Sequence, residues 1–191
     1  MTKPKILLSG ASGTGKTTVA KYLSEKYDVP RMSFTGPNGE DWSAARYTAW
    51  TIIGKPRPYE VPDRRQFQLK LIKVMGDWID AHNDTGYVSD RGDADQWAYS
   101  CLHGPDELRD NPDIFREAIA RPDQTVSVCY MHRFFRLGDD AARKEAVAYH
   151  RATESLIECY LWHFAGLKDG VGWVRIETLV DAKELEAWRA R

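Results

Sequence analysis

The chain has 191 residues, of which 42% are hydrophobic, and this is enough material for one well-buried core. Its formal net charge of -1 excludes a strong overall attraction to nucleic acid or to an anionic membrane, although a local basic patch stays open. No apolar run approaches the roughly 20 residues of a membrane span, and no export signal opens the chain. We therefore expect a single cytoplasmic domain over residues 1–191, with a small diffusible partner and no membrane contact.

Strand and helix patterns alternate along the chain. Residues 5–9 form a short apolar run typical of a buried strand, and residues 17–27 carry apolar residues at helical spacing. Asp63 is placed to cap a helix with one apolar stripe. Further strands are predicted at 31–35, 87–90, 125–130 and 172–177, and further helices at 94–103, 112–120, 141–165 and from Asp181 onward. The pattern predicts an α/β fold, in which five parallel strands carry helices on both faces.

Residues 10–17 read Gly-Ala-Ser-Gly-Thr-Gly-Lys-Thr and match the phosphate-loop pattern GxxxxGK[ST] in full. The match stands between a predicted strand and a predicted helix, as the pattern requires. Lys16 is expected to neutralise the β and γ phosphates of ATP, and the hydroxyl of Thr17 to coordinate Mg²⁺. The residues expected to hold the nucleotide are Gly10, Ser12, Gly13, Thr14, Gly15, Lys16, Thr17 and Thr18.

The phosphate loop alone leaves the reaction open. GTPases read guanine with an Asn-Lys-x-Asp segment, and none of the three asparagines, Asn38, Asn83 and Asn111, begins one. Large ATPase machines need additional helical domains and arginines from neighbouring subunits, for which 191 residues leave little room. A compact kinase with a three-layer P-loop fold fits better.

Asp90 and Arg91 follow the predicted strand at 87–90. If that strand lies beside the first one, Asp90 faces the phosphate loop, where it would hold Mg²⁺ through water or accept the proton of an acceptor hydroxyl. The planar fork of Arg91 suits a phosphate that is being transferred or accepted. The plainer alternative is a salt bridge at the end of the strand.

Three features together resemble the P-loop nucleoside and nucleotide kinases: the phosphate loop, a central strand that ends in Asp-Arg, and the sequence D-x-x-A-Y over residues 95–99. The layout is most similar to the ribosylnicotinamide-kinase-like and the virus-encoded deoxynucleotide kinases. The resemblance implies a nucleoside-monophosphate-kinase-like fold, with a lid at about residues 132–143. Arg133 and Arg136, and after them Arg143, would then reach the phosphates; the alternative is a solvated charged loop.

The same resemblance implies an acceptor side at about residues 33–73. Asp41, Trp42 and Arg46 are the substrate-binding candidates there, together with Arg91, and Asp41 rivals Asp90 as the general base. Single aromatic residues at helical spacing are more often part of the core. The sequence does not report the oligomeric state.

A local excess of basic residues keeps DNA as an alternative phosphate acceptor. Between residues 55 and 73 there are six basic residues against two acidic ones, and this excess could track a nucleic-acid backbone or simply be a solvated helix face. The leading prediction is transfer of the γ-phosphate of ATP to a nucleoside, a nucleotide or a related acceptor. One alternative is a viral-type kinase that acts on 5-hydroxymethyluridine in DNA, and another is a regulatory module that binds ATP without catalysis. The six basic residues are Lys55, Arg57, Arg64, Arg65, Lys70 and Lys73.

Overall fold

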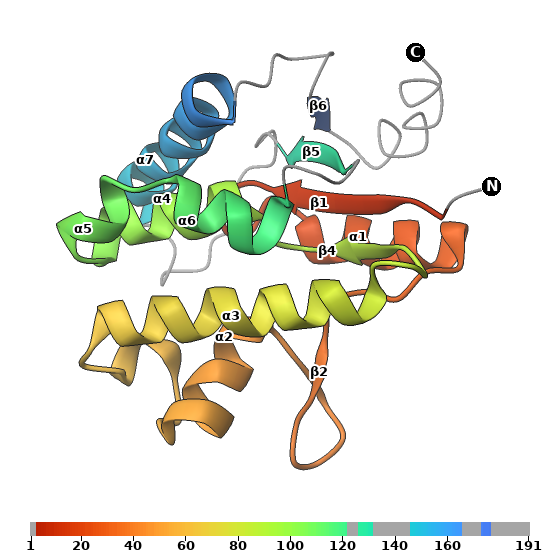
Figure 1. Cartoon of the computed structure of the whole chain (residues 1–191), viewed down its shortest axis with the longest axis horizontal. Coiled ribbons are helices and arrows are strands. Elements are labelled where there is room, and N and C mark those ends of the chain that lie inside the picture. The colour runs from red at the N-terminus through yellow and green to blue at the C-terminus, as the bar shows by residue number, and fades with distance from the viewer. Residues whose placement is uncertain (1–2, 122–125, 132–145, 166–172, 177–191) are drawn as a thin grey trace.

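A parallel β-sheet forms the centre of the molecule in the computed structural model (Figure 1). Neighbouring strands follow the order β4-β1-β5-β6, and all three pairings are parallel. The strands are β1 (Lys5–Ser9), β4 (Tyr87–Ser89), β5 (Ser127–Met131) and β6 (Trp173–Ile176). The structure describes residues 3–121, 126–131, 146–165 and 173–176.

The predicted fifth strand over residues 31–35 is wrong. Arg31 forms only an isolated parallel bridge with Val88, on the outer side of β4. The next residues leave the sheet, because β2 (Phe34–Thr35) pairs antiparallel with β3 (Asp41–Trp42) in a separate hairpin. The glycine-containing turn between them closes with a bond from the Gly36 amide to the Glu40 carbonyl (2.7 Å). The central sheet of the described residues therefore has four strands.

Four long helices surround the sheet. Helix α3 begins where it was predicted, because the Asp63 carboxylate accepts the Gln66 amide (2.8 Å) as its N-cap. No helix in the described part of the chain is long and apolar enough to cross a membrane. Residues 141–145 and the predicted helix from Asp181 lie outside the described residues. The long helices are α1 (Lys16–Tyr27), α3 (Arg64–His82), α4 (Asp93–His103) and α7 (Ala146–Cys159), which continues as a π-helical turn, η5 (Tyr160–Phe164).

Shorter helical turns connect these elements. They are α2 (Ala44–Tyr47), η1 (Thr48–Ile53) and η2 (Pro58–Glu60) before α3, and α5 (Asp106–Arg109), α6 (Asp113–Phe115) and η3 (Arg116–Ala120) after α4. The segment with α2 and β2 lies on the far side of α3 from the sheet (Figure 1).

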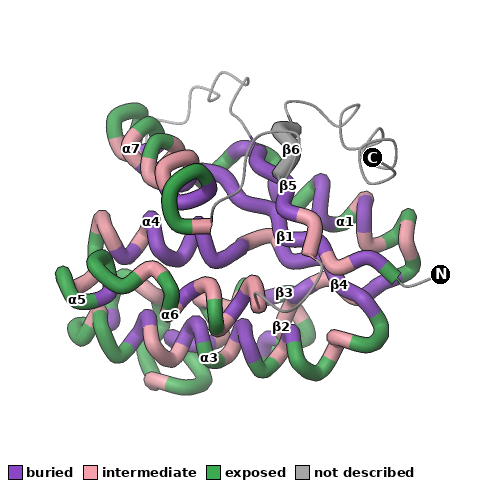
Figure 2. Tube along the Cα trace, turned by 45° about the horizontal axis from the view of Figure 1, so that its top comes forward, coloured by how far each residue is buried: buried purple, intermediate pink, exposed green. Residues whose placement is uncertain are grey.

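Alternate residues of the central strands face two separate cores. Ile6 and Leu8 of β1 pack with Val19 and Leu23 of α1, whereas Leu7 packs with the cluster formed by α3, α4 and α7. Figure 2 shows the buried residues concentrated along the sheet and along the inner sides of these helices. Helices thus cover both faces of the sheet, which gives the three-layer α/β arrangement of P-loop proteins.

The pairing of β1 with β4 brings two strand ends to the same edge of the sheet. Leu7 of β1 is in register with Ser89 of β4, so Asp90 follows β4 close to the point where the loop leaves β1 at Ser9. Ligands of open parallel sheets bind at this edge, beyond the carboxyl ends of the strands.

Candidate functional site

The phosphate loop wraps around the N-terminus of α1. Gly13 and Gly15 have φ values of 79° and 90°, in the left-handed region that favours glycine. Such a loop turns its amide groups inward, and the positive end of the α1 dipole points at the same space. A cavity of about 350 Å³ lies there, and its lining residues are Ser12, Gly13, Gly15, Lys16, Thr17, Asp90 and Arg91.

Lys16 lies folded across the loop. Its Nζ donates to the carbonyl oxygens of Gly10 (2.5 Å) and Ala11 (2.6 Å), and only 6% of the residue is exposed. Burial lowers the pKa of Lys16 to about 8; the charge of Arg91 lowers it too, whereas Asp95 raises it. The ammonium therefore keeps its proton near neutral pH, although burial costs the charge more than the nearby carboxylates return, and a phosphate would supply further negative charge.

Thr17 and Asp90 meet across the cavity. The Thr17 hydroxyl donates to Oδ2 of Asp90 (3.1 Å), so the loop and the end of β4 touch. The described residues contain no group of three or more His, Cys, Asp or Glu side chains that could hold a metal. Mg²⁺ does not need such a cage, since it binds through one or two protein oxygens together with phosphates and water. A hydroxyl and a carboxylate beside a phosphate cavity are a donor set that fits this ion.

Arg91 points into the space beside Asp90. Its Nη1 donates to the Tyr99 hydroxyl (2.8 Å), and the guanidinium lies 4.8 Å from the centre of the Tyr99 ring. The ion pair that the structure shows for Arg91 is with Asp95 (3.6 Å), not with Asp90. Asp95 and Tyr99 both belong to the D-x-x-A-Y segment, so side chains of α4 hold Arg91 in place.

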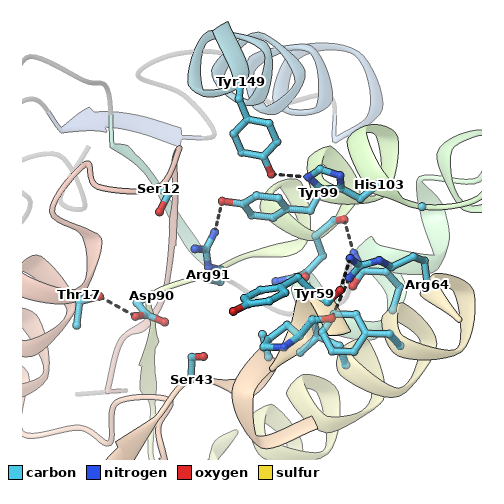
Figure 3. A pocket seen from close by; sticks show the side chains of 17 residues that line it. Ser12, Thr17, Ser43, Tyr59, Arg64, Asp90, Arg91, Tyr99, His103 and Tyr149 are labelled. Atoms are coloured by element: carbon cyan, nitrogen blue, oxygen red, sulfur yellow. Dashed lines mark hydrogen bonds between the residues drawn. The ribbon is translucent and has the colours of Figure 1, made fainter. Parts of the chain in front are cut away.

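A second cavity of about 530 Å³ adjoins the phosphate cavity and shares Ser12, Thr17, Asp90 and Arg91 with it. Figure 3 shows Thr17 and Asp90 at one end and Arg64 and His103 at the other, with Arg91 and Tyr99 between them. The other lining residues come from α3, α4, α7 and the connection before α3, and they are Ser43, Ala45, Pro58, Tyr59, Phe67, Gln68, Leu71, Gln96, Gly104 and Tyr149.

Hydrogen bonds hold several polar side chains of this second cavity in place. The Gln68 amide nitrogen donates to Ser100 Oγ (2.9 Å), while its Oε1 is buried and has no hydrogen-bond partner within the described residues. Nε2 of His103 and the Tyr149 hydroxyl form a hydrogen bond (2.8 Å). Burial, followed by the charge of Arg64, lowers the pKa of His103, so that this ring is neutral at pH 7.

Of the predicted acceptor residues, Arg91 lines this cavity, whereas Asp41, Trp42 and Arg46 do not. Asp41 pairs with Arg31 (2.6 Å), Trp42 is 3% exposed, and Arg46 lies over the Trp42 ring at 4.5 Å. The same segment reaches the cavity through Ser43 and Ala45 instead. The predicted lid arginines, Arg133, Arg136 and Arg143, lie outside the described residues.

Several cavity residues escaped prediction. Gln68 carried a usable signal, because it is a buried amide next to Phe67 and Leu71 on the apolar stripe of α3. A buried amide on such a stripe needs a partner, and a ligand is one. Tyr59 and Tyr149 carried no comparable signal, because they lie 90 positions apart in the sequence and only the fold brings them together.

Asp93, two residues after Arg91, is a buried carboxyl group that lines neither cavity. It is 3% exposed, and burial raises its pKa to about 6, while a hydrogen bond with Tyr160 lowers it in part. In the unfolded chain the same group titrates near pH 4. Between these two values the folded protein binds more protons than the unfolded chain, so stability falls as the pH rises, and the full cost is present above pH 6.

We predict that Asp93→Asn stabilises the protein at neutral pH, because it removes this cost. Two units of pKa correspond to a gain on the order of 2 to 3 kcal/mol in the free energy of unfolding. Urea unfolding at pH 7.5 and at about pH 4 measures the effect. The gain should be present at pH 7.5 and absent at the lower value, and an equal change at both would contradict the account.

Comparison with known proteins places the chain in a family. Residues 5–166, which include the phosphate loop, β4 and every residue that lines the second cavity, match the family model described as AAA domain. The chain belongs to this family. The description names no reaction, and no curated protein matches the chain.

Solved structures of other proteins share the fold of this chain. NadR in complex with NAD and AMP-PNP superposes with a TM-score of 0.63 at 15% identity, over 100% of this chain and 50% of NadR. The chain thus spans about half the length of NadR. The deoxyadenosine kinase of M. mycoides with bound dATP gives a TM-score of 0.55 at 13% identity, over 97% of this chain and 98% of the kinase. The P-loop α/β fold predicted for the chain is confirmed, whereas the predicted lid stays a prediction. At these identities the likeness shows the fold alone.

Proposed function

We propose that the protein transfers the γ-phosphate of ATP to a hydroxyl of a nucleoside or nucleotide. One observation carries the proposal: the phosphate cavity and the larger cavity share Asp90 and Arg91 at their junction. A donor in the first cavity and an acceptor in the second would meet at these two side chains. The kinase folds of NadR and of deoxyadenosine kinase agree with this assignment.

The residues at the junction suit an in-line transfer. The acceptor oxygen would form a bond to the γ-phosphorus while the bond to the β-γ bridging oxygen breaks, so that ADP leaves and the hydroxyl proton passes to Asp90. Lys16 and the loop amides would hold the phosphates of the donor, and Arg91 would bind the charge that spreads over the transferred group. Thr17 and Asp90 would hold Mg²⁺, which would neutralise charge on the phosphates. Arg133 and Arg136 stay candidates for the same task from the lid.

The charge in the second cavity favours an acceptor with an uncharged base. Its far end carries Arg64 and a neutral His103, and the acidic residue of its lining is Asp90, at the opposite end. A cationic base would meet a positive charge there without a carboxylate to balance it. Aromatic rings of Tyr59, Phe67 and other lining residues offer faces for a neutral base instead.

A competition assay tests the acceptor class. Neutral nucleosides and their monophosphates should be phosphorylated by ATP, whereas a nucleoside with a permanently cationic base should be neither a substrate nor an inhibitor. Preference for the cationic nucleoside would contradict this assignment. Binding of ATP without any product from either class would favour the non-catalytic regulatory module.

Gln68 should contribute to acceptor binding. We predict that Gln68→Leu raises the KM for the acceptor roughly tenfold and leaves the KM for ATP unchanged, because a buried hydrogen-bond partner of the base is lost. Steady-state kinetics with each substrate varied in turn measures both values. Gln66→Leu is the matched control, since Gln66 is exposed on the same helix. Equal effects of the two variants would refute the role of Gln68.

A nucleotide within DNA remains a second candidate acceptor, because exposed aromatic and basic side chains occur in the connection before α3, where Tyr59 lines the larger cavity. Tyr59 lines the cavity and is 61% exposed, and Arg57 lies over its ring at 5.6 Å. Trp50 is 48% exposed in the preceding turn, and Lys55 is exposed between them. Such side chains can stack on bases and follow a phosphate backbone. Activity on an oligonucleotide should then fall steeply with salt, whereas activity on a mononucleotide should change little.

A further inference from the structure

Asp95 joins the two halves of the site. It is the third residue of α4 and is completely buried. Its Oδ2 accepts the amide of Gly92 (3.0 Å), as the third residue of a helix often does for its N-cap, and its Oδ1 accepts the amide of Gly10 (3.2 Å). Gly10 is the first residue of the phosphate loop, and Gly92 ends the turn that carries Asp90 and Arg91. One carboxylate therefore connects two segments that are far apart in the sequence.

The same carboxylate also holds Arg91. Oδ1 of Asp95 lies 3.6 Å from Nη1 of Arg91, whose other partner is the Tyr99 hydroxyl. A buried carboxylate is costly unless hydrogen-bond donors and a cation surround it. Two backbone amides and one guanidinium meet that requirement here, and each of the three belongs to the candidate site.

The two segments that Asp95 connects have no room to move toward their neighbours. A Cβ on Gly10 would lie 2.7 Å from the Met131 carbonyl oxygen, and a Cβ on Gly92 would lie 2.8 Å from Ser9 Oγ. Both glycines are thus in close contact with adjacent backbone or side chains. Without the Asp95 carboxylate, the amides of Gly10 and Gly92 would lose the hydrogen-bond acceptor that they share.

We propose that Asp95 is a positioning residue, which holds the start of the phosphate loop and the guanidinium of Arg91 in the single arrangement that donor and acceptor both need. The inference rests on the proposed function, in which the donor fills the phosphate cavity and the acceptor lies beside Arg91. Asp95 touches neither substrate in this account and acts through the groups that it holds.

Calorimetric titration with MgADP tests the proposal. Asp95→Asn should bind MgADP roughly tenfold more weakly at pH 7, because the new amide nitrogen must face an N–H donor. It should also lower kcat at saturating ATP, because Arg91 loses its carboxylate partner. Asp93→Asn is the matched control: it removes an equally buried carboxyl from the same turn of α4 and should bind MgADP like the wild type.

Two results would overturn the proposal. One is an Asp95→Asn protein that matches the wild type in affinity and in kcat, and the other is a wild-type protein that does not bind MgADP. If Asp95→Asn does not fold, hydrogen exchange of the wild type decides instead, since the amides of Gly10 and Gly92 must both be protected, and rapid exchange at either contradicts the account. A wild type that binds MgADP but transfers no phosphate would remove the proposed function and leave the positioning of the loop by Asp95 in place.

Discussion

Lys16→Ala should abolish phosphoryl transfer, with kcat/KM lower by roughly a thousandfold or more, while the fold is retained. The side chain is the buried cation of the phosphate cavity, and its bonds to the Gly10 and Ala11 carbonyls show that it already lies over the loop. A steady-state assay with labelled ATP measures the loss, and circular dichroism checks the fold.

Stability should not fall in this variant, because burial lowers the pKa of Lys16 and the buried charge therefore costs stability at neutral pH. Lys21→Ala is the matched control, since Lys21 is exposed on the same helix and should keep full activity. Turnover of Lys16→Ala within a few fold of the wild type would mean that the loop does not serve transfer.

Asp90→Asn should lower kcat by roughly a hundred- to ten-thousandfold, with a much smaller effect on the affinity for ADP in the absence of Mg²⁺. Asp90 is the carboxylate that lines both cavities and touches Thr17, so base and metal ligand alike are lost with it. Rapid-quench kinetics at saturating substrates isolates the chemical step from binding.

The rival base gives a sharp comparison. Asp41 pairs with Arg31 outside the lining of either cavity, so Asp41→Asn should keep most of the activity. Asp84→Asn, an exposed carboxylate in the turn before β4, controls for a general loss of negative charge. If Asp41→Asn loses activity and Asp90→Asn keeps it, the general base has been assigned to the wrong residue.

The phosphate loop could be predicted because its chemistry is local. Eight consecutive residues specify the turn, the anion-binding amides and Lys16, and the strand before them and the helix after them are continuous in the sequence. The prediction that Asp90 lies across from Thr17 depended on one long-range contact, the pairing of β4 with β1. The structure shows this pairing.

The acceptor side could not be predicted in the same way. The glycine-rich turn after residue 35 was visible, but nothing local shows whether the strand before such a turn stays in the central sheet or folds back as the hairpin of β2 and β3. Trp42 and Arg46 were candidates by residue type, yet they contact each other, because the Arg46 guanidinium lies over the Trp42 ring. The cavity is built instead from α3, α4 and α7, whose relative placement depends on packing between distant segments.

A single-turnover reaction tests the central claim most directly. Protein in excess over ATP labelled at the γ-phosphate, with Mg²⁺ and a mixture of neutral nucleosides and nucleotides, should move the label onto an acceptor hydroxyl or phosphate. The same reaction with Lys16→Ala and with Asp90→Asn should leave the label on ATP. Label released only as inorganic phosphate, or retained wholly on ATP by wild-type protein that binds it, would contradict the assignment of this site to phosphoryl transfer.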